Sequence, residues 1–164
     1  MIKKLMSYIG EYKRDTLLSP ISVTFEVILE VLLPMLMAKV IDNGVEAGNM
    51  NYVVKMGLLM LVVAMLSLAA GTLSGVFAAR ASMGFGKNLR KAMYDNIQDF
   101  SFQNIDHFST AGLVTRMTTD VTNVQNAYQM LIRMFVRAPI MMISALVMCV
   151  SISPKISLIF LIAL

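Results

Sequence analysis

The 164-residue sequence contains a single cysteine, Cys149, and a single histidine, His107. One cysteine excludes an internal disulfide, and these two residues cannot supply the ligand cluster of a metal site. A nucleophile–base pair is excluded as well, because Cys149 lies in an apolar stretch and His107 in a short loop. We therefore expect no catalytic residue, no metal and no cofactor site in this chain.

Charged residues are also scarce. They make up 15% of the chain against 57% hydrophobic residues, a balance that excludes an ordinary soluble domain. The 24 residues between Lys55 and Arg80 carry no charge. As a helix they would extend roughly 36 Å, which exceeds a hydrocarbon core of ~30 Å. The N-terminus has neither the continuous apolar core nor the small-residue cleavage site of a signal peptide.

The apolar stretches predict an all-α membrane protein. We expect the first span at residues 17–41, the second span with a polar continuation at 53–103, and a polar arm leading into the third span at 112–152. Residues 156–164 begin a fourth apolar stretch. Because they cover under half of a bilayer, we expect the chain to be truncated in its fourth span.

Polar stretches on either side of residues 101–109 keep helical spacing. The first apolar stripe comprises Phe85, Leu89, Met93, Ile97 and Phe100. The second comprises Leu113, Met117, Val121, Val124, Tyr128 and Leu131. A helix that continues out of the membrane needs a partner for such a stripe. We therefore expect two long helices that project together and meet at a short tip; an ordinary loop is the alternative.

Basic residues are distributed unequally. Most precede the first span or lie between the second and third spans: Lys3, Lys4, Lys13, Arg14, Arg80, Lys87, Arg90, Lys91, Arg116, Arg133 and Arg137. The positive-inside bias then predicts a cytoplasmic N-terminus and cytoplasmic arms. In residues 1–14 the apolar side chains share one face, which predicts a short interfacial helix; a frayed terminus is the alternative.

Two acidic residues fall within the first predicted span. Glu26 and Glu30 are four residues apart and share one helix face. A charge at this depth costs ~2.5–3.5 kcal/mol on insertion scales, so such residues usually face an interior or a cavity. They form a possible substrate cavity for a cation or a proton, or they are neutral acids hydrogen-bonded to neighbouring helices. Gly71-x-x-x-Gly75 in the second span permits close helix packing.

The segment from Phe102 to Gln125 resembles the first intracellular loop of ABC exporters. Further resemblance lies in Arg133-x-x-x-Arg-Ala-Pro139 and in Ser153-Pro154-Lys155. It is closest to the half-transporters of bacterial heterodimeric multidrug exporters and covers nearly the whole chain. The phosphate-binding sequence Gly-x-x-x-x-Gly-Lys-[Ser/Thr] is missing, and Gly84-Phe-Gly86-Lys87 is only a chance fragment of a glycine-rich pattern on a helix. The matching loop residues are Leu113, Thr115, Arg116, Asp120 and Val121.

The resemblance implies the transmembrane domain of an ATP-driven exporter, with ATP and magnesium bound in a nucleotide-binding domain that is absent here. It implies a second half-transporter as partner and a drug or lipid-like substrate. The expected coupling helix, which would dock on the ATPase domain with Phe108 and Ile105 as apolar anchors, comprises Asn104, Ile105, Asp106, His107, Phe108 and Ser109. The alternative is a small membrane scaffold or regulatory subunit without ATPase coupling.

Overall fold

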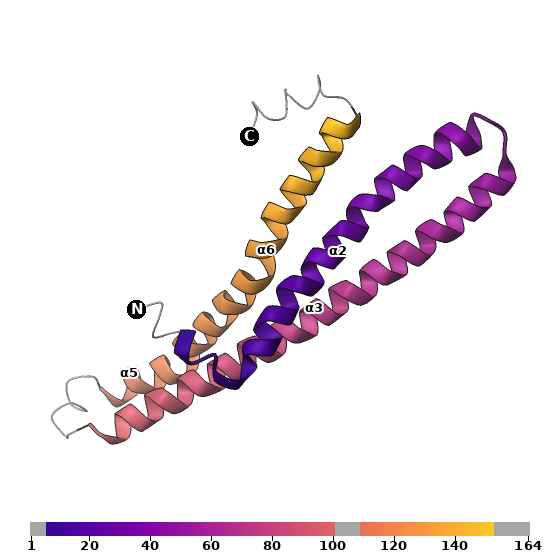
Figure 1. Cartoon of the computed structure of the whole chain (residues 1–164). Helices are drawn as coiled ribbons and strands as arrows, with labels where there is room; N and C mark the ends of the chain where they lie inside the picture. Colours follow the sequence, from indigo (N-terminus) through magenta and orange to yellow (C-terminus); the bar gives the residue numbers. More distant parts are fainter. Residues whose placement is uncertain (1–5, 101–108, 153–164) are drawn as a thin grey trace. The chain divides into compact units, whose positions relative to one another are not determined.

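A computed structural model describes residues 6–100 and 109–152 of the chain. Its regular elements are all helical (Figure 1). Helix α2 spans Lys13–Val40, α3 spans Met50–Gln98 and α6 spans Val121–Ile152. Shorter elements are the 3-10 turn η1 (Gly10–Tyr12), helix α5 (Thr110–Thr115) and the π-helical segments η2 (Ile41–Val45) and η3 (Arg116–Asp120).

Three helical stretches are long and apolar enough to cross a membrane. They are Gly10–Val45, Met50–Gln98 and Thr110–Val150. This confirms the all-α membrane fold that the uncharged run and the apolar stripes predict. The chain divides into two compact units, which we describe separately. The arm unit comprises Met1–Ser19 and Gly75–Arg133, and the membrane unit comprises Pro20–Ser74 and Met134–Leu164.

In the arm unit, the second half of α3 packs against the first half of α6. The rings of Phe85 and Tyr128 stack with centroids 4.7 Å apart and an interplanar angle of 23°. Tyr128 also packs against a buried cluster of Ala78, Ala81 and Ile132. The small alanines allow the two backbones to approach, and the stacked rings fill the remaining space. The two predicted stripes therefore meet at Phe85 and Tyr128.

The N-terminal segment binds to both arms of this unit. Asn88 Nδ2 donates to the carbonyl oxygen of Tyr8 at 2.9 Å, and Thr16 Oγ1 donates to the carbonyl of Tyr12 at 2.9 Å. Because that bond uses the threonine hydrogen, the Tyr128 hydroxyl donates to Thr16 at 2.9 Å. Burial raises the pKa of the Tyr128 phenol, which keeps this donor in its neutral form.

Two glycines on α3 make the close contacts of the arm unit possible. A Cβ on Gly84 would overlap the ring of Tyr12, and a Cβ on Gly86 would overlap the Gln125 amide. Gly84 and Gly86 do lie on a helix, as the sequence indicates. Their place in the fold is to admit side chains from the N-terminal segment and from α6.

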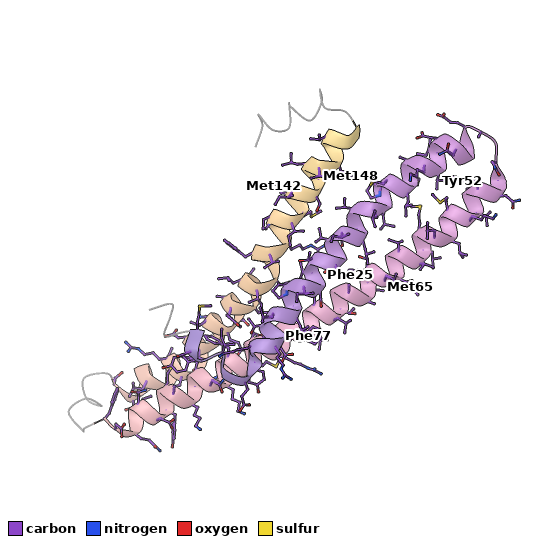
Figure 2. All side chains as sticks on the ribbon, in the orientation of Figure 1. Phe25, Tyr52, Met65, Phe77, Met142 and Met148 are labelled. Carbon is purple, nitrogen blue, oxygen red and sulfur yellow. The ribbon has the colours of Figure 1, made fainter. Side chains whose placement is uncertain are left out.

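In the membrane unit, α2 and the first half of α3 form a hairpin. Asn49 starts α3, since its Oδ1 accepts from the Tyr52 backbone amide at 3.2 Å. Gly48 precedes it with φ +62°, a left-handed conformation that favours glycine. Apolar side chains point outward along all three long helices, and Phe25, Met65 and Met142 are exposed (Figure 2). Such exposure suits helices that lie in lipid.

Candidate functional site

The site with the most distinctive chemistry lies in the membrane unit, where α2 and α6 bring three charged side chains together. Arg137 Nη1 donates to Glu26 Oε1 at 2.7 Å. Its Nη2 donates to both carboxylate oxygens of Glu30, at 2.9 and 2.8 Å. We call these three residues the ionic cluster. The i, i+4 spacing on α2 sets the two carboxylates one turn apart, and one guanidinium reaches both.

The three side chains differ in burial. The Glu26 side chain is 9% exposed, whereas Arg137 is 32% and Glu30 34% exposed. Glu26 Oε2 is buried and has no hydrogen-bond partner among the described residues. A buried carboxylate oxygen without a donor is costly in a medium of low dielectric constant. Glu30 is thus the well-bonded carboxylate of the cluster, and Glu26 is the incompletely bonded one.

Helix α3 shapes the wall beside Glu26. A Cβ on Gly71 would stand 2.8 Å from Glu26 Oε1 and 3.0 Å from its Cδ, so a larger residue here would require this carboxylate to shift. Ser67 Oγ makes a long hydrogen bond of 3.5 Å to the carbonyl oxygen of Glu26. The small residues of α3 therefore hold α2 at the distance at which Glu26 fits.

An apolar hollow of about 380 Å³ lies on α6 in the same unit. Its lining residues are Met134, Phe135, Ala138 and Pro139. Phe135 is 77% exposed, so the surface of the hollow includes an accessible aromatic ring beside the ring of Pro139. The membrane unit thus combines the ionic cluster with apolar surface. Its part of α3 between residues 56 and 74 carries no charged residue.

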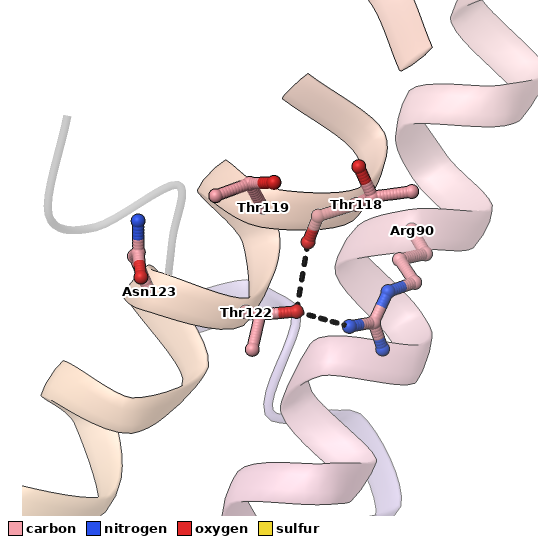
Figure 3. A pocket seen from close by; sticks show the side chains of 5 residues that line it. All are labelled: Arg90, Thr118, Thr119, Thr122 and Asn123. Atoms are coloured by element: carbon pink, nitrogen blue, oxygen red, sulfur yellow. Dashed lines mark hydrogen bonds between the residues drawn. The ribbon is translucent and has the colours of Figure 1, made fainter. Parts of the chain in front are cut away.

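A polar pocket of about 400 Å³ lies in the arm unit and is open to solvent (Figure 3). Arg90 Nη2 donates to Thr122 Oγ1 at 3.0 Å, and Thr122 donates in turn to the Thr118 carbonyl at 2.7 Å. The first bond links α3 to α6, and the second links α6 to η3. The lining residues are Arg90, Thr118, Thr119, Thr122 and Asn123.

Of the predicted coupling residues, Asn104, Ile105, Asp106, His107 and Phe108 lie outside the described residues. Ser109 is described, and it caps α5 by accepting a hydrogen bond from the Gly112 amide at 3.2 Å. Its φ of 53° and ψ of 141° are unusual for a residue other than glycine. The capping role suits the serine that the sequence places at the start of this helix.

The pairing of Arg137 with Glu26 and Glu30 was not predicted from the sequence. Arg137 was interpreted there as one of the basic residues that flank the third span and as part of the Arg133-x-x-x-Arg-Ala-Pro139 segment. The signal that was available is that Arg137 lies only three residues inside the apolar stretch beginning at Met134. A charge inside a predicted span requires a partner, and the two glutamates are the acidic residues inside the first span.

In a comparison with known protein families, residues 16–164 match the family described as ABC transporter transmembrane region. The chain is 32% identical over 163 residues to the uncharacterized ABC transporter ATP-binding protein YfiB of Bacillus subtilis (strain 168), covering 99% of the chain and 28% of that protein. It is 29% identical over 150 residues to the uncharacterized ABC transporter ATP-binding protein MT1311 of Mycobacterium tuberculosis (strain CDC 1551 / Oshkosh), covering 92% and 26%.

A more distant similarity is to an ATP-dependent lipid A-core flippase of Albidiferax ferrireducens. The identity is 26% over 128 residues, covering 76% of the chain and 21% of the flippase. The chain spans about a quarter of the length of the curated relatives that it matches.

Proposed function

We propose that this chain, which belongs to the ABC transporter transmembrane region family, is the membrane-spanning part of an ATP-driven exporter. Membership makes it the transmembrane part of an ABC transporter. The proposal goes further, in that the chain lines a substrate pathway and transmits the motion of an ATPase domain to it. Its cytoplasmic side is the N-terminus together with the arm unit.

The observation that carries the proposal is the continuation of α3 and α6 beyond their apolar stretches into a packed pair of arms. Helix α3 runs unbroken from Met50 to Gln98, although its uncharged run ends at Ala79. The stacked pair of Phe85 and Tyr128 joins it to α6 beyond that point. A packed pair of helices moves as one body, so force applied at its tip would reach the membrane helices.

ATP and magnesium do not fit the residues of this chain. No phosphate-binding loop occurs in its sequence, and the described residues contain no group of three side chains suited to a metal ion. We place both on a nucleotide-binding domain, which would dock on the tip at residues 104–109. The similar proteins of Bacillus and Mycobacterium are named ATP-binding, which supports a domain of this kind as partner. A second half-transporter, in a heterodimer, is the other proposed partner.

We propose a drug or lipid-like substrate. The apolar hollow at Met134, Phe135, Ala138 and Pro139 suits an apolar chain or ring. The similarity to a flippase named for lipid A-core favours the lipid-like class. Glu26 and Glu30 would line the substrate cavity, with Arg137 balancing part of their charge.

A substitution at the tip tests the coupling role. In the intact transporter that carries this chain, Phe108→Ala removes a proposed apolar anchor, and such anchors typically account for ~2 kcal/mol or more of association. We expect lost transport of a fluorescent lipid analogue from reconstituted vesicles, with basal ATP hydrolysis retained and its stimulation by substrate lost. Tyr94→Ala, which removes an exposed aromatic from the same arm, is the matched control and should leave all three readouts unchanged. Normal transport and stimulation in Phe108→Ala would refute the role of this residue.

A further inference from the structure

We propose that Arg137 is a positioning residue with two alternative partners on α2, and that the membrane-unit part of α6 shifts along α2 between them. In one register Arg137 engages Glu26, and in the other it engages Glu30. The described geometry is then the midpoint between the two. The use of this shift in transport rests on the proposed function, whereas the existence of two registers does not.

The guanidinium of Arg137 divides its donors between the two glutamates. A guanidinium bound to one carboxylate commonly uses two parallel N–H donors on it. Here Nη1 is on Glu26, at 2.7 Å, and Nη2 is on Glu30, at 2.8 and 2.9 Å. The two carboxylates are four residues apart on one helix face, a separation of ~6 Å along the axis. One cation therefore lies between two docks of the same chemistry.

Neither register satisfies both carboxylates. Glu26 Oε2 is buried and has no partner among the described residues, and Nη2, which would complete an end-on fork with Nη1 on Glu26, is bonded to Glu30. Within the described part of the membrane unit, no other charged side chain of α2, α3 or α6 forms an ion pair with this cluster. Two incompletely satisfied arrangements that exclude each other give a two-state element.

Within the membrane unit, the apolar contacts of α6 offer little resistance to the shift. The α6 residues beyond Arg137 are mostly apolar and exposed, among them Met141, Ile143 and Val147. In lipid, apolar side chains gain nothing from one apolar neighbour over another. The wall beside Glu26 is a glycine, Gly71, whose missing side chain leaves the carboxylate its space. Shifts of one helical turn between packed elements are an established way for proteins to switch.

Two spin labels measure the register directly. The labelled positions are Ile21 on α2 and Val147 on α6, which are 62% and 64% exposed, in a Cys149→Ser background of the intact protein. The membrane-unit parts of α2 and α6 run in the same direction (Figure 1), so a shift of α6 changes the distance between the labels. Electron–electron double resonance in lipid nanodiscs, first without nucleotide, gives this distance.

We expect the two single variants to move the label distance in opposite directions. Glu26→Gln leaves Glu30 as the sole carboxylate, which draws Arg137 toward the C-terminal end of α2 and lengthens the distance. Glu30→Gln leaves Glu26 and shortens it. The two means should differ by ~3–6 Å, with the rise over four helical residues as the upper bound. Both variants keep one carboxylate for one guanidinium, so both retain a balanced pair and should fold.

A control and a second condition make the outcomes distinct. Glu46→Gln, in an exposed turn, should reproduce the parent distance. Equal distances in Glu26→Gln and Glu30→Gln, or shifts in the same direction, would overturn the two-register proposal and leave Arg137 as a simple anchor. Adding ATP with vanadate to the parent protein then tests the proposed function separately. Opposite shifts in the variants with no nucleotide effect in the parent would retain the two registers and contradict their use in transport.

Discussion

The arm unit and the membrane unit are built from the same long helices but are held together by different contacts. In the arm unit, aromatic stacking, close contacts at Gly84 and Gly86, and hydrogen bonds join three chain segments at many points. In the membrane unit, most large apolar side chains are exposed, and the specific contacts gather around Glu26. One region has many modest contacts, and the other depends on one ionic cluster with its glycine.

The proposed surroundings of the two units, water for the arm unit and lipid for the membrane unit, explain the difference. In water, an apolar stripe drives two helices together and needs only complementary shape. Lipid offers apolar side chains no such preference, so small residues and polar groups decide which helices pair. We therefore expect a single substitution at the ionic cluster to lower the free energy of unfolding more than a single substitution in the arm unit does.

The largest effect is expected from Arg137→Gln. It leaves two carboxylates in the membrane unit without their cation, and Glu26 is nine-tenths buried. Removing one partner of a buried pair typically costs ~3–5 kcal/mol, and the partial exposure of Arg137 and Glu30 places this case at the lower end. Unfolding of the protein in mixed micelles by increasing denaturant measures the loss.

A neutral triple variant is the control for this comparison. Glu26→Gln, Glu30→Gln and Arg137→Gln together remove all three charges while keeping side-chain size. Because no unpaired charge is left, we expect most of the lost stability to return. If the triple variant is as unstable as Arg137→Gln alone, packing around Arg137, and not its charge, holds this unit together.

A smaller effect is expected from Gly84→Ala in the arm unit. Alanine in a helix interior usually stabilises by ~1 kcal/mol relative to glycine, but here its Cβ overlaps the Tyr12 ring. Overpacking of this kind costs ~1–3 kcal/mol, so the same unfolding measurement should show a net loss. Gly57→Ala, where no atom lies within 4 Å of the added Cβ, should be neutral or stabilising. Equal effects at both glycines would contradict the close packing of Gly84 against the Tyr12 ring.

Much of the fold could be predicted from the sequence, because long helices produce local patterns of apolar and charged residues. The uncharged run before Arg80 and the two stripes through Phe85 and Tyr128 predict three long helices, and the structure confirms them. The π-helical segment Arg116–Asp120 left no such pattern, since one extra residue in a turn does not disturb the spacing enough. The close contact between Gly84 and Tyr12 was also not predicted, because Tyr12 lies on a different segment of the chain.

Of the three residues of the ionic cluster, only the two glutamates could be predicted to lie together. The shared face of Glu26 and Glu30 follows from their spacing on one helix. Their bond to Arg137 joins residues 107 and 111 positions apart, and no periodicity within α2 or α6 shows that the two helices adjoin. The tip at residues 104–109 remains a prediction from resemblance, apart from the capping bond of Ser109.

The central claim is that the arm unit lies in water on the cytoplasmic side while the membrane unit crosses the bilayer. Its most direct test is labelling of single cysteines with a membrane-impermeant thiol reagent in a Cys149→Ser background. Exposed positions for this test are Lys91 and Asn123 in the arm unit and Asn51 in the first turn of α3. We predict that Asn51→Cys reacts in intact cells, whereas Lys91→Cys and Asn123→Cys react only in inverted membrane vesicles. Labelling of Lys91→Cys and Asn123→Cys in intact cells would contradict the account.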